Sequence, residues 1–204
     1  LGNFKLEGTW TGDKHPIVQI AFRQRIVGIY GIDYYLSFVL PFLSKRYHFK
    51  NYIAVAHSLA CPCIIRTEMK HSSSKTFPHL TKCALIAGPF DGVTYLGDIP
   101  NVNVLNENGR PSMMNPHYLY LLFNRRKFNP NISVLNIYGN VLDNTNTDKF
   151  ISVVSAKSIR YILAPKAHFY QEVEVRGKND AEHSWMHDNP FVIDIINKFL
   201  NLKK

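Results

Sequence analysis

The chain has 204 residues, of which 46% are hydrophobic and 19% are charged, and this composition excludes an intrinsically disordered protein. No stretch approaches the roughly 20 consecutive apolar residues of a membrane-spanning helix. The length suits one domain over residues 1–204, built around a single large core.

The net charge of +9, from 24 basic and 15 acidic residues, favours an anionic partner. The basic residues are scattered along the chain, and the densest run is Arg125-Arg126-Lys127. No nucleic-acid-binding motif accompanies this charge. We therefore expect no nucleic-acid partner, and an association with the anionic cell envelope instead.

The three cysteines, Cys61, Cys63 and Cys83, have the spacing of neither a disulfide framework nor a zinc site. We expect them to be buried free thiols, and we expect no metal and no other cofactor. So few cysteines, in an odd number, suit either a reducing compartment or an exported bacterial protein without disulfides.

The pattern of apolar residues predicts strands interleaved with helices. The expected elements, in chain order, are a strand at 16–22, a helix at 30–47, a strand at 51–55, a helix at 59–70, a strand at 82–87, a helix at 113–123, a strand at 132–139, a helix at 155–163, a strand at 168–175 and a helix at 190–200. The segment 89–112, rich in Gly, Pro, Asn and Asp, is expected to form a long surface excursion of the kind that often covers a site. This alternation predicts a mostly parallel sheet with helices on both faces.

One short motif organises the chain: Ala56-His57-Ser58-Leu59-Ala60, directly after the strand at 51–55. A strand, a sharp turn and a helix would place Ser58 at the apex of a nucleophile elbow, usually written G-x-S-x-G. Both glycines are alanine here, which is still small but less permissive. The N–H of Leu59 would be an oxyanion donor at the start of the helix. Taken alone, the pentapeptide also suits a serine that merely caps a helix.

Two further polar features follow later strands of the predicted sheet. Sites in parallel sheets form at the carboxyl ends of the strands, and Ser58, the loop 143–148 and His183 each follow a predicted strand. The order Ser, then Asp, then His along the chain is that of α/β-hydrolases. This order favours a serine hydrolase over a capping serine.

The base and the acid each have two candidates. For the base that accepts the serine proton, His183 is favoured over His187, because His183 lies on the loop directly after the last strand. For the acid, Asp148 is favoured over Asp143, because its longer reach lets the loop curl towards the histidine. The same loop lacks the glycine and the final acidic residue of a calcium loop.

On these residues the sequence resembles a family of cell-surface α/β-hydrolases of uncharacterised function from Gram-positive bacteria. The resemblance is carried by the strand at 16–22, AHSLA at 56–60, VLNIYG at 134–139, TD at 147–148, YQE at 170–172 and HSWMHDN at 183–189. It implies an α/β-hydrolase fold, with Ser58 as nucleophile, Asp148 as acid and His183 as base. It also implies an extracellular or envelope-associated location, with the cytoplasm as the alternative.

Two features depart from that family. Its elbow is usually G-H-S-M-G, and its first strand and H-G-x-G-G-like turn, which supplies a second oxyanion donor, have no match in residues 1–50. We therefore expect an N-terminally incomplete α/β-hydrolase, in which the strand missing between 16–22 and 51–55 leaves strand edges exposed. The expected activity is that of a carboxylesterase or lipase, acting on a small-molecule or lipid ester through an acyl-enzyme. The alternative is a weakly active or inactive relative that serves as a binding module.

Overall fold

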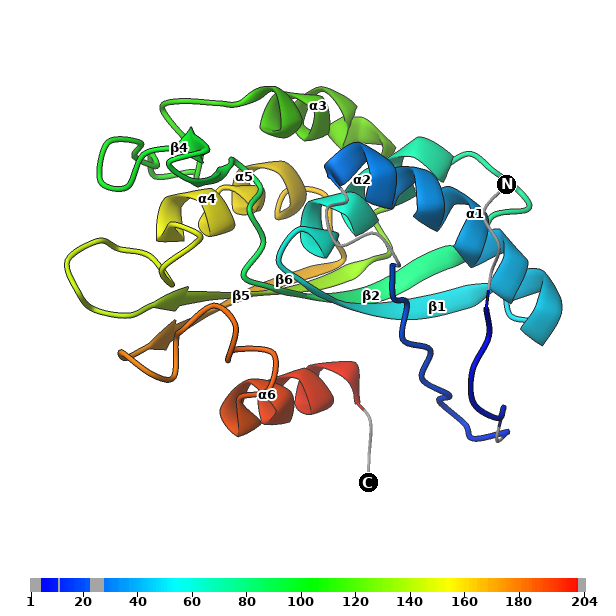
Figure 1. Ribbon diagram of the computed structural model, residues 1–204. Helices are drawn as coiled ribbons and strands as arrows, with labels where there is room; N and C mark the ends of the chain where they lie inside the picture. Colours follow the sequence, from blue (N-terminus) through cyan, green and yellow to red (C-terminus); the bar gives the residue numbers. More distant parts are fainter. Residues whose placement is uncertain (1–4, 11, 23–27, 202–204) are drawn as a thin grey trace.

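The computed structural model describes residues 5–10, 12–22 and 28–201 (Figure 1). Its α-helices are α1 (Ile29–Tyr47), α2 (Ala60–His71), α3 (Pro116–Asn124), α4 (Val153–Lys157), α5 (Ile159–Leu163) and α6 (Pro190–Leu200), with a 3-10 turn, η1 (Arg125–Lys127), after α3. Its strands are β1 (Asn51–His57), β2 (His79–Ile86), β3 (Val93–Thr94), β4 (Gly97–Asp98), β5 (Ser133–Asn140) and β6 (Phe169–Arg176). None of the helices in these ranges is both long and apolar enough to cross a bilayer.

The main sheet has four strands in the order β1-β2-β5-β6, and all neighbouring pairs are parallel. Helices α1 to α5 cover one face and α6 covers the other, as Figure 1 shows. This is the parallel sheet with helices on both faces that the alternation of elements predicts. Because every strand of this sheet runs the same way, the carboxyl ends of β1, β2, β5 and β6 lie along one edge.

Each face of the sheet has its own hydrophobic core. Alternate residues of the central strands point to opposite faces, so Cys83 and Leu85 of β2 pack towards α1 and α2, whereas Ala84 and Ile86 pack towards α6. Burial on both faces explains why the second half of β2, from Cys83 to Ile86, is a continuous apolar run rather than an alternating one, and why only Asn136 interrupts the apolar run of β5 from Val134 to Tyr138.

The strand predicted at 16–22 is absent, and this prediction is wrong. The segment has no regular structure, and Ile17 is 91% exposed, while Ile20 and Phe22 rest against the core beside the helices. A strand needs a neighbour to accept its hydrogen bonds, and this segment does not pair with the free edge of β1, the last strand of the described sheet. Ile53 and Val55 of β1 are exposed, on the face opposite to Tyr52 and Ala54, which pack against the core.

The loop that leads into α6 is fixed by its capping residue, Asn189. The Asn189 side-chain oxygen accepts a hydrogen bond from the Phe191 N–H, and Pro190 occupies the first helical position, where its missing N–H is not needed. The Asn189 side-chain amide also donates to the Asp180 carbonyl at 3.0 Å. One residue therefore closes the loop 180–189 at its base, and this loop carries His183.

Candidate active site

Ser58 lies at the sharp turn between β1 and α2. It has a φ of +53°, a left-handed conformation that is rare for residues other than glycine and asparagine. Two backbone hydrogen bonds hold the turn: the Ser58 N–H donates to the Ile86 carbonyl at 2.8 Å, and the Cys61 N–H donates to the Ser58 carbonyl at 2.9 Å. Strained backbone of this kind persists only where the surroundings fix it, and it directs the Ser58 side chain out of the sheet edge.

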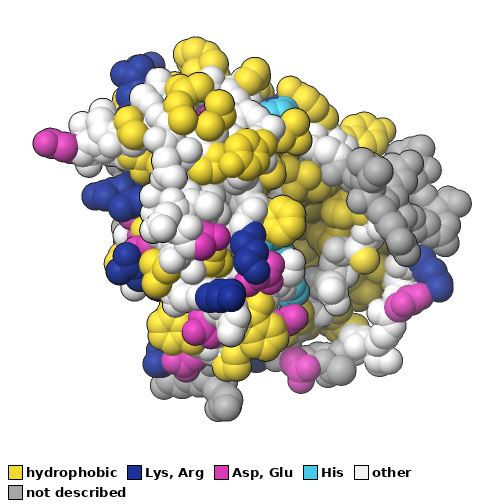
Figure 2. All heavy atoms as spheres, turned by 60° about the vertical axis from the view of Figure 1, so that its left-hand side comes forward, with side chains coloured by type: hydrophobic (Ala, Val, Ile, Leu, Met, Phe, Trp, Pro, Cys, Tyr) yellow, Lys and Arg dark blue, Asp and Glu magenta, His cyan; other side chains and the backbone are white. Residues whose placement is uncertain are grey.

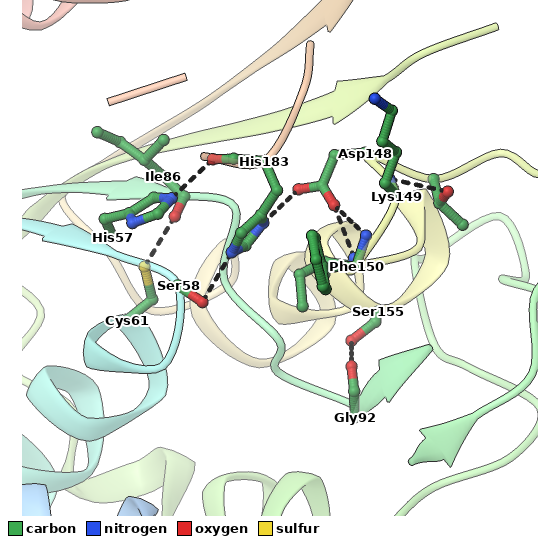
Figure 3. Close-up of polar contacts among 12 residues, drawn as sticks. His57, Ser58, Cys61, Ile86, Gly92, Asp148, Lys149, Phe150, Ser155 and His183 are labelled. Atoms are coloured by element: carbon green, nitrogen blue, oxygen red, sulfur yellow. Dashed lines mark hydrogen bonds and ion pairs between the residues drawn. The ribbon is translucent and has the colours of Figure 1, made fainter. Parts of the chain in front are cut away.

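His183 and Asp148 complete a line of three polar side chains from separate loops. The Ser58 hydroxyl lies 3.0 Å from His183 Nε2, and His183 Nδ1 lies 2.8 Å from Asp148 Oδ2 (Figure 3). A carboxylate can only accept, so the Nδ1 proton belongs to His183. This leaves Nε2 as the acceptor for the serine hydroxyl, which is the arrangement that a general base requires.

Asp148 is held in place from the side opposite to the histidine. Its Oδ1 accepts hydrogen bonds from the Phe150 and Ile151 N–H groups at 2.9 and 2.7 Å, and its own carbonyl accepts the His183 N–H at 3.0 Å. The side chain is almost completely buried, as is that of His183. A buried, doubly anchored carboxylate fixes both the orientation and the tautomer of the imidazole.

A family model for "Alpha/beta hydrolase of unknown function (DUF915)" matches residues 2–203. The chain belongs to this family. The product of the gene lin2722 of Listeria innocua has a similar structure, with a TM-score of 0.82 and 24% identity, over 97% of this chain and 77% of that one. The "putative cell surface hydrolase" of Lactobacillus plantarum WCFS1 is also similar, with a TM-score of 0.67 and 19% identity, over 86% of this chain and 64% of that one. At these identities the two structures support the fold. No curated protein matches the sequence significantly.

His57 also belongs to the site of this DUF915 protein, and the sequence reasoning did not assign it a role. Its Nε2 donates to the His183 carbonyl at 3.0 Å, and its ring lies between those of His183 and His187, with centroids 4.8 and 4.6 Å away. Burial, reinforced by the neighbouring His183, lowers the pKa of His57 to about 4. A neutral His57 therefore links the nucleophile turn to the base loop, and its place directly before Ser58 was the signal available in the sequence.

The two alternative residues lie outside the line of hydrogen bonds. The ring of His187 is tilted by 40° against that of His57, and its Nε2 lies 3.3 Å from the carboxylate of its neighbour Asp188. Asp143 is exposed, and its carboxylate accepts from the Thr145 N–H and hydroxyl, which lower its pKa. The structure thus brings Ser58 together with the favoured base and the favoured acid, and leaves both alternatives aside.

Leu59, the expected oxyanion donor, follows Ser58 at the beginning of α2. Backbone N–H groups in the first turn of a helix have no acceptor within it, so the Leu59 N–H is available for negative charge beside the serine. Across the described ranges, no cluster of three or more His, Cys, Asp or Glu residues could hold a metal ion. Asp148 turns inward to His183, which is not the geometry of a calcium loop.

Proposed function

We propose that this protein is a serine hydrolase that cleaves ester bonds through Ser58, His183 and Asp148. The observation that carries the proposal is the pair of hydrogen bonds at 3.0 and 2.8 Å that connects three side chains far apart in the sequence. A capping serine needs neither a histidine nor a buried carboxylate behind it. The strained turn at Ser58 adds support, because strain of this kind gathers at functional sites.

The reaction has two steps. Ser58 Oγ attacks the ester carbonyl carbon while its proton passes to His183 Nε2, and the negative charge that forms on the carbonyl oxygen faces the Leu59 N–H. His183 then gives the proton to the departing alkoxide as the bond from carbon to that oxygen breaks, leaving an acyl group on Ser58. In the second step, water gives its proton to His183 and attacks the acyl carbon, and Ser58 leaves with the proton restored. Asp148 stabilises the imidazolium in both steps.

The substrate class that we propose is a small-molecule or lipid ester, met at the cell envelope. The positive net charge favours an anionic surface, and the structural relative from Lactobacillus bears a name that refers to the cell surface. The rival function is a binding module without catalysis. Alanines in place of both elbow glycines, and the absence of an H-G-x-G-G-like turn from residues 1–50, favour that rival.

A fluorophosphonate probe separates the two functions, because it reacts covalently with an activated serine and with no ordinary one. We expect the wild-type protein to be labelled and to hydrolyse p-nitrophenyl acetate. Ser58→Ala should abolish labelling and lower the hydrolysis by at least about 10³-fold. Ser72→Ala, at the other end of α2, is the matched control and should change neither. Absence of labelling in the wild-type protein, or labelling that survives in Ser58→Ala, would overturn the proposal.

A further inference from the structure

The excursion between β2 and α3 has an unusual distribution of apolar and acidic side chains. Several of its large hydrophobic side chains face solvent, with Tyr95 at 82% and Leu96 at 75% exposure, while the carboxylates of Asp91 and Asp98 are buried. A loop with no partner is expected to do the reverse, and an exposed apolar patch is informative for that reason. Together with two residues of the loop before α4, these side chains form a surface that we call the apolar rim: Tyr95, Leu96, Ile99, Val102, Val104, Leu142 and Phe150.

The buried polar groups of the excursion hold this conformation. The Asp91 carboxylate accepts hydrogen bonds from the Asn115 N–H at 2.8 Å and from the Asn103 side-chain amide at 2.9 Å. The Asp98 carboxylate accepts a hydrogen bond from the Ser152 hydroxyl. Asn103 accepts in turn from the Met113 N–H. The apolar side chains are therefore kept at the surface by a polar framework beneath them, rather than left there by a lack of structure.

The apolar rim lies beside the candidate active site. The Thr94 N–H donates to the Phe150 carbonyl at 2.9 Å, and Asn101 exchanges side-chain hydrogen bonds with the loop 144–146. The ring of Phe150 lies 5.4 Å from that of His183. Figure 2 shows this side of the molecule, where hydrophobic side chains cover the upper part and continue into a hollow next to histidine side chains. The apolar rim therefore borders the triad at Phe150.

The charge of the surface suits an anionic partner more strongly than the net charge of +9 suggests. Among the described residues, five acidic side chains are buried, at Asp33, Glu68, Asp91, Asp98 and Asp148, and no Lys or Arg is. The charges that face solvent are thus mainly basic. Basic surface charge combined with exposed aromatic and aliphatic side chains is the chemistry that binds anionic lipid layers.

We propose that the apolar rim docks on the surface of an anionic phospholipid layer and so presents the triad to lipid esters in that layer. The rim and the positive surface supply the binding, and the second part of the inference rests on the proposed ester hydrolysis. The side chains of the rim lie on two loops of different shape, which present neither a strand edge nor a helix face to a protein partner. A lipid layer, which needs no such matching surface, therefore suits the rim better. The two parts can be tested separately.

Co-sedimentation with vesicles of mixed phosphatidylglycerol and phosphatidylcholine tests the binding. We expect the wild-type protein to sediment with these vesicles, and to do so less at high salt or with phosphatidylcholine alone. The double variant Tyr95→Ser, Leu96→Ser should bind at least about tenfold more weakly. Its matched control is Ile17→Ser, Phe123→Ser, which removes two equally exposed side chains outside the rim and should bind as the wild type does. Melting curves show whether each variant is folded.

The outcomes separate the two proposals. Ser58→Ala should bind the vesicles as tightly as the wild type while hydrolysing nothing, so a failure of catalysis leaves the binding result readable. Equal binding by both double variants, or no binding by the wild type, overturns the lipid surface. A wild-type dimer that the Tyr95→Ser, Leu96→Ser variant converts to monomer in sedimentation velocity also overturns it, because the rim would then be a contact between two copies of the chain.

Discussion

Replacing Asp148 with asparagine tests the triad through the tautomer of His183. Two backbone N–H groups, of Phe150 and Ile151, point at Oδ1, so an asparagine must keep its oxygen there. Its amide nitrogen is then forced to face His183 Nδ1, where the carboxylate Oδ2 now lies at 2.8 Å. A donor in that place requires Nδ1 to accept, and the imidazole proton moves to Nε2, where it points at Ser58.

The change of tautomer lowers kcat. Nε2 can no longer take the serine proton, and the imidazolium also loses its anionic partner. The same substitution in a triad of this type lowers kcat by about 10⁴, which corresponds to about 5.4 kcal/mol in the activation free energy. We expect a loss of this order for p-nitrophenyl acetate at pH 7, with little change in KM and an unchanged fold.

Asp143→Asn is the control, because it removes a carboxylate from the same loop that is exposed and makes no contact with His183 among the described interactions. It should leave kcat within about twofold, as is usual for surface substitutions away from a site. A kcat for Asp148→Asn within tenfold of the wild type would refute the reasoning. So would an Asp143→Asn variant with the larger loss, since the acid would then have been assigned to the wrong residue.

Three further predictions concern other groups. His57→Phe keeps a ring between the histidines but loses the hydrogen bond to the His183 carbonyl, so kcat should fall by about two- to tenfold. The kcat of His57→Gln should fall less, because glutamine can still donate that hydrogen bond. Equal losses in the two variants would contradict a positioning role. Burial raises the pKa of Glu68 to about 7, so the folded protein keeps a proton that the unfolded chain releases near pH 4.5. The free energy of unfolding, measured with urea, should therefore fall by at most about 3 kcal/mol as the pH rises from 4.5 to 7. Glu68→Gln should remove this pH dependence. Burial also raises the thiol pKa of all three cysteines, so none should react with iodoacetamide at pH 8 until the protein is unfolded; fast reaction of the folded protein would show that a thiol is accessible.

The parts of the fold that the sequence predicted are those in which local pattern and tertiary role agree. The second half of β2 and most of the centre of β5 are apolar because they are buried on both faces, and the small residues around Ser58 fit the sharp turn that β1 makes into α2. Parallel strands bring the loops at their carboxyl ends to one edge, so the order of the polar loops indicated which loops would meet. Within them, reach favoured Asp148 over Asp143, and the place directly after the last strand favoured His183 over His187.

The segment 16–22 could not be predicted in the same way, because a strand depends on a neighbour to accept its hydrogen bonds. Its composition is that of a strand, yet β1 is the last member of the described sheet and the segment does not pair with it. A sequence pattern indicates the preference of a segment for strand conformation. Only the folded sheet shows whether a neighbouring strand is there to accept its hydrogen bonds.

His57 and the apolar rim were missed for a different reason, which bears on how this protein works. Nothing in the sequence marks a histidine next to a serine as a link to a carbonyl more than one hundred residues away. Likewise, Tyr95 and Leu96 read as ordinary loop residues until Asp91 and Asp98 are seen to be buried beneath them. In both cases the informative fact is an inversion of the usual environment: a histidine kept neutral by burial, and apolar side chains kept outside by buried acids. Such inversions cost stability, and a fold retains them where a function requires them. His57 contacts His183 directly, and the apolar rim reaches it through Phe150, which is a further argument for the proposed catalytic site over an inert scaffold.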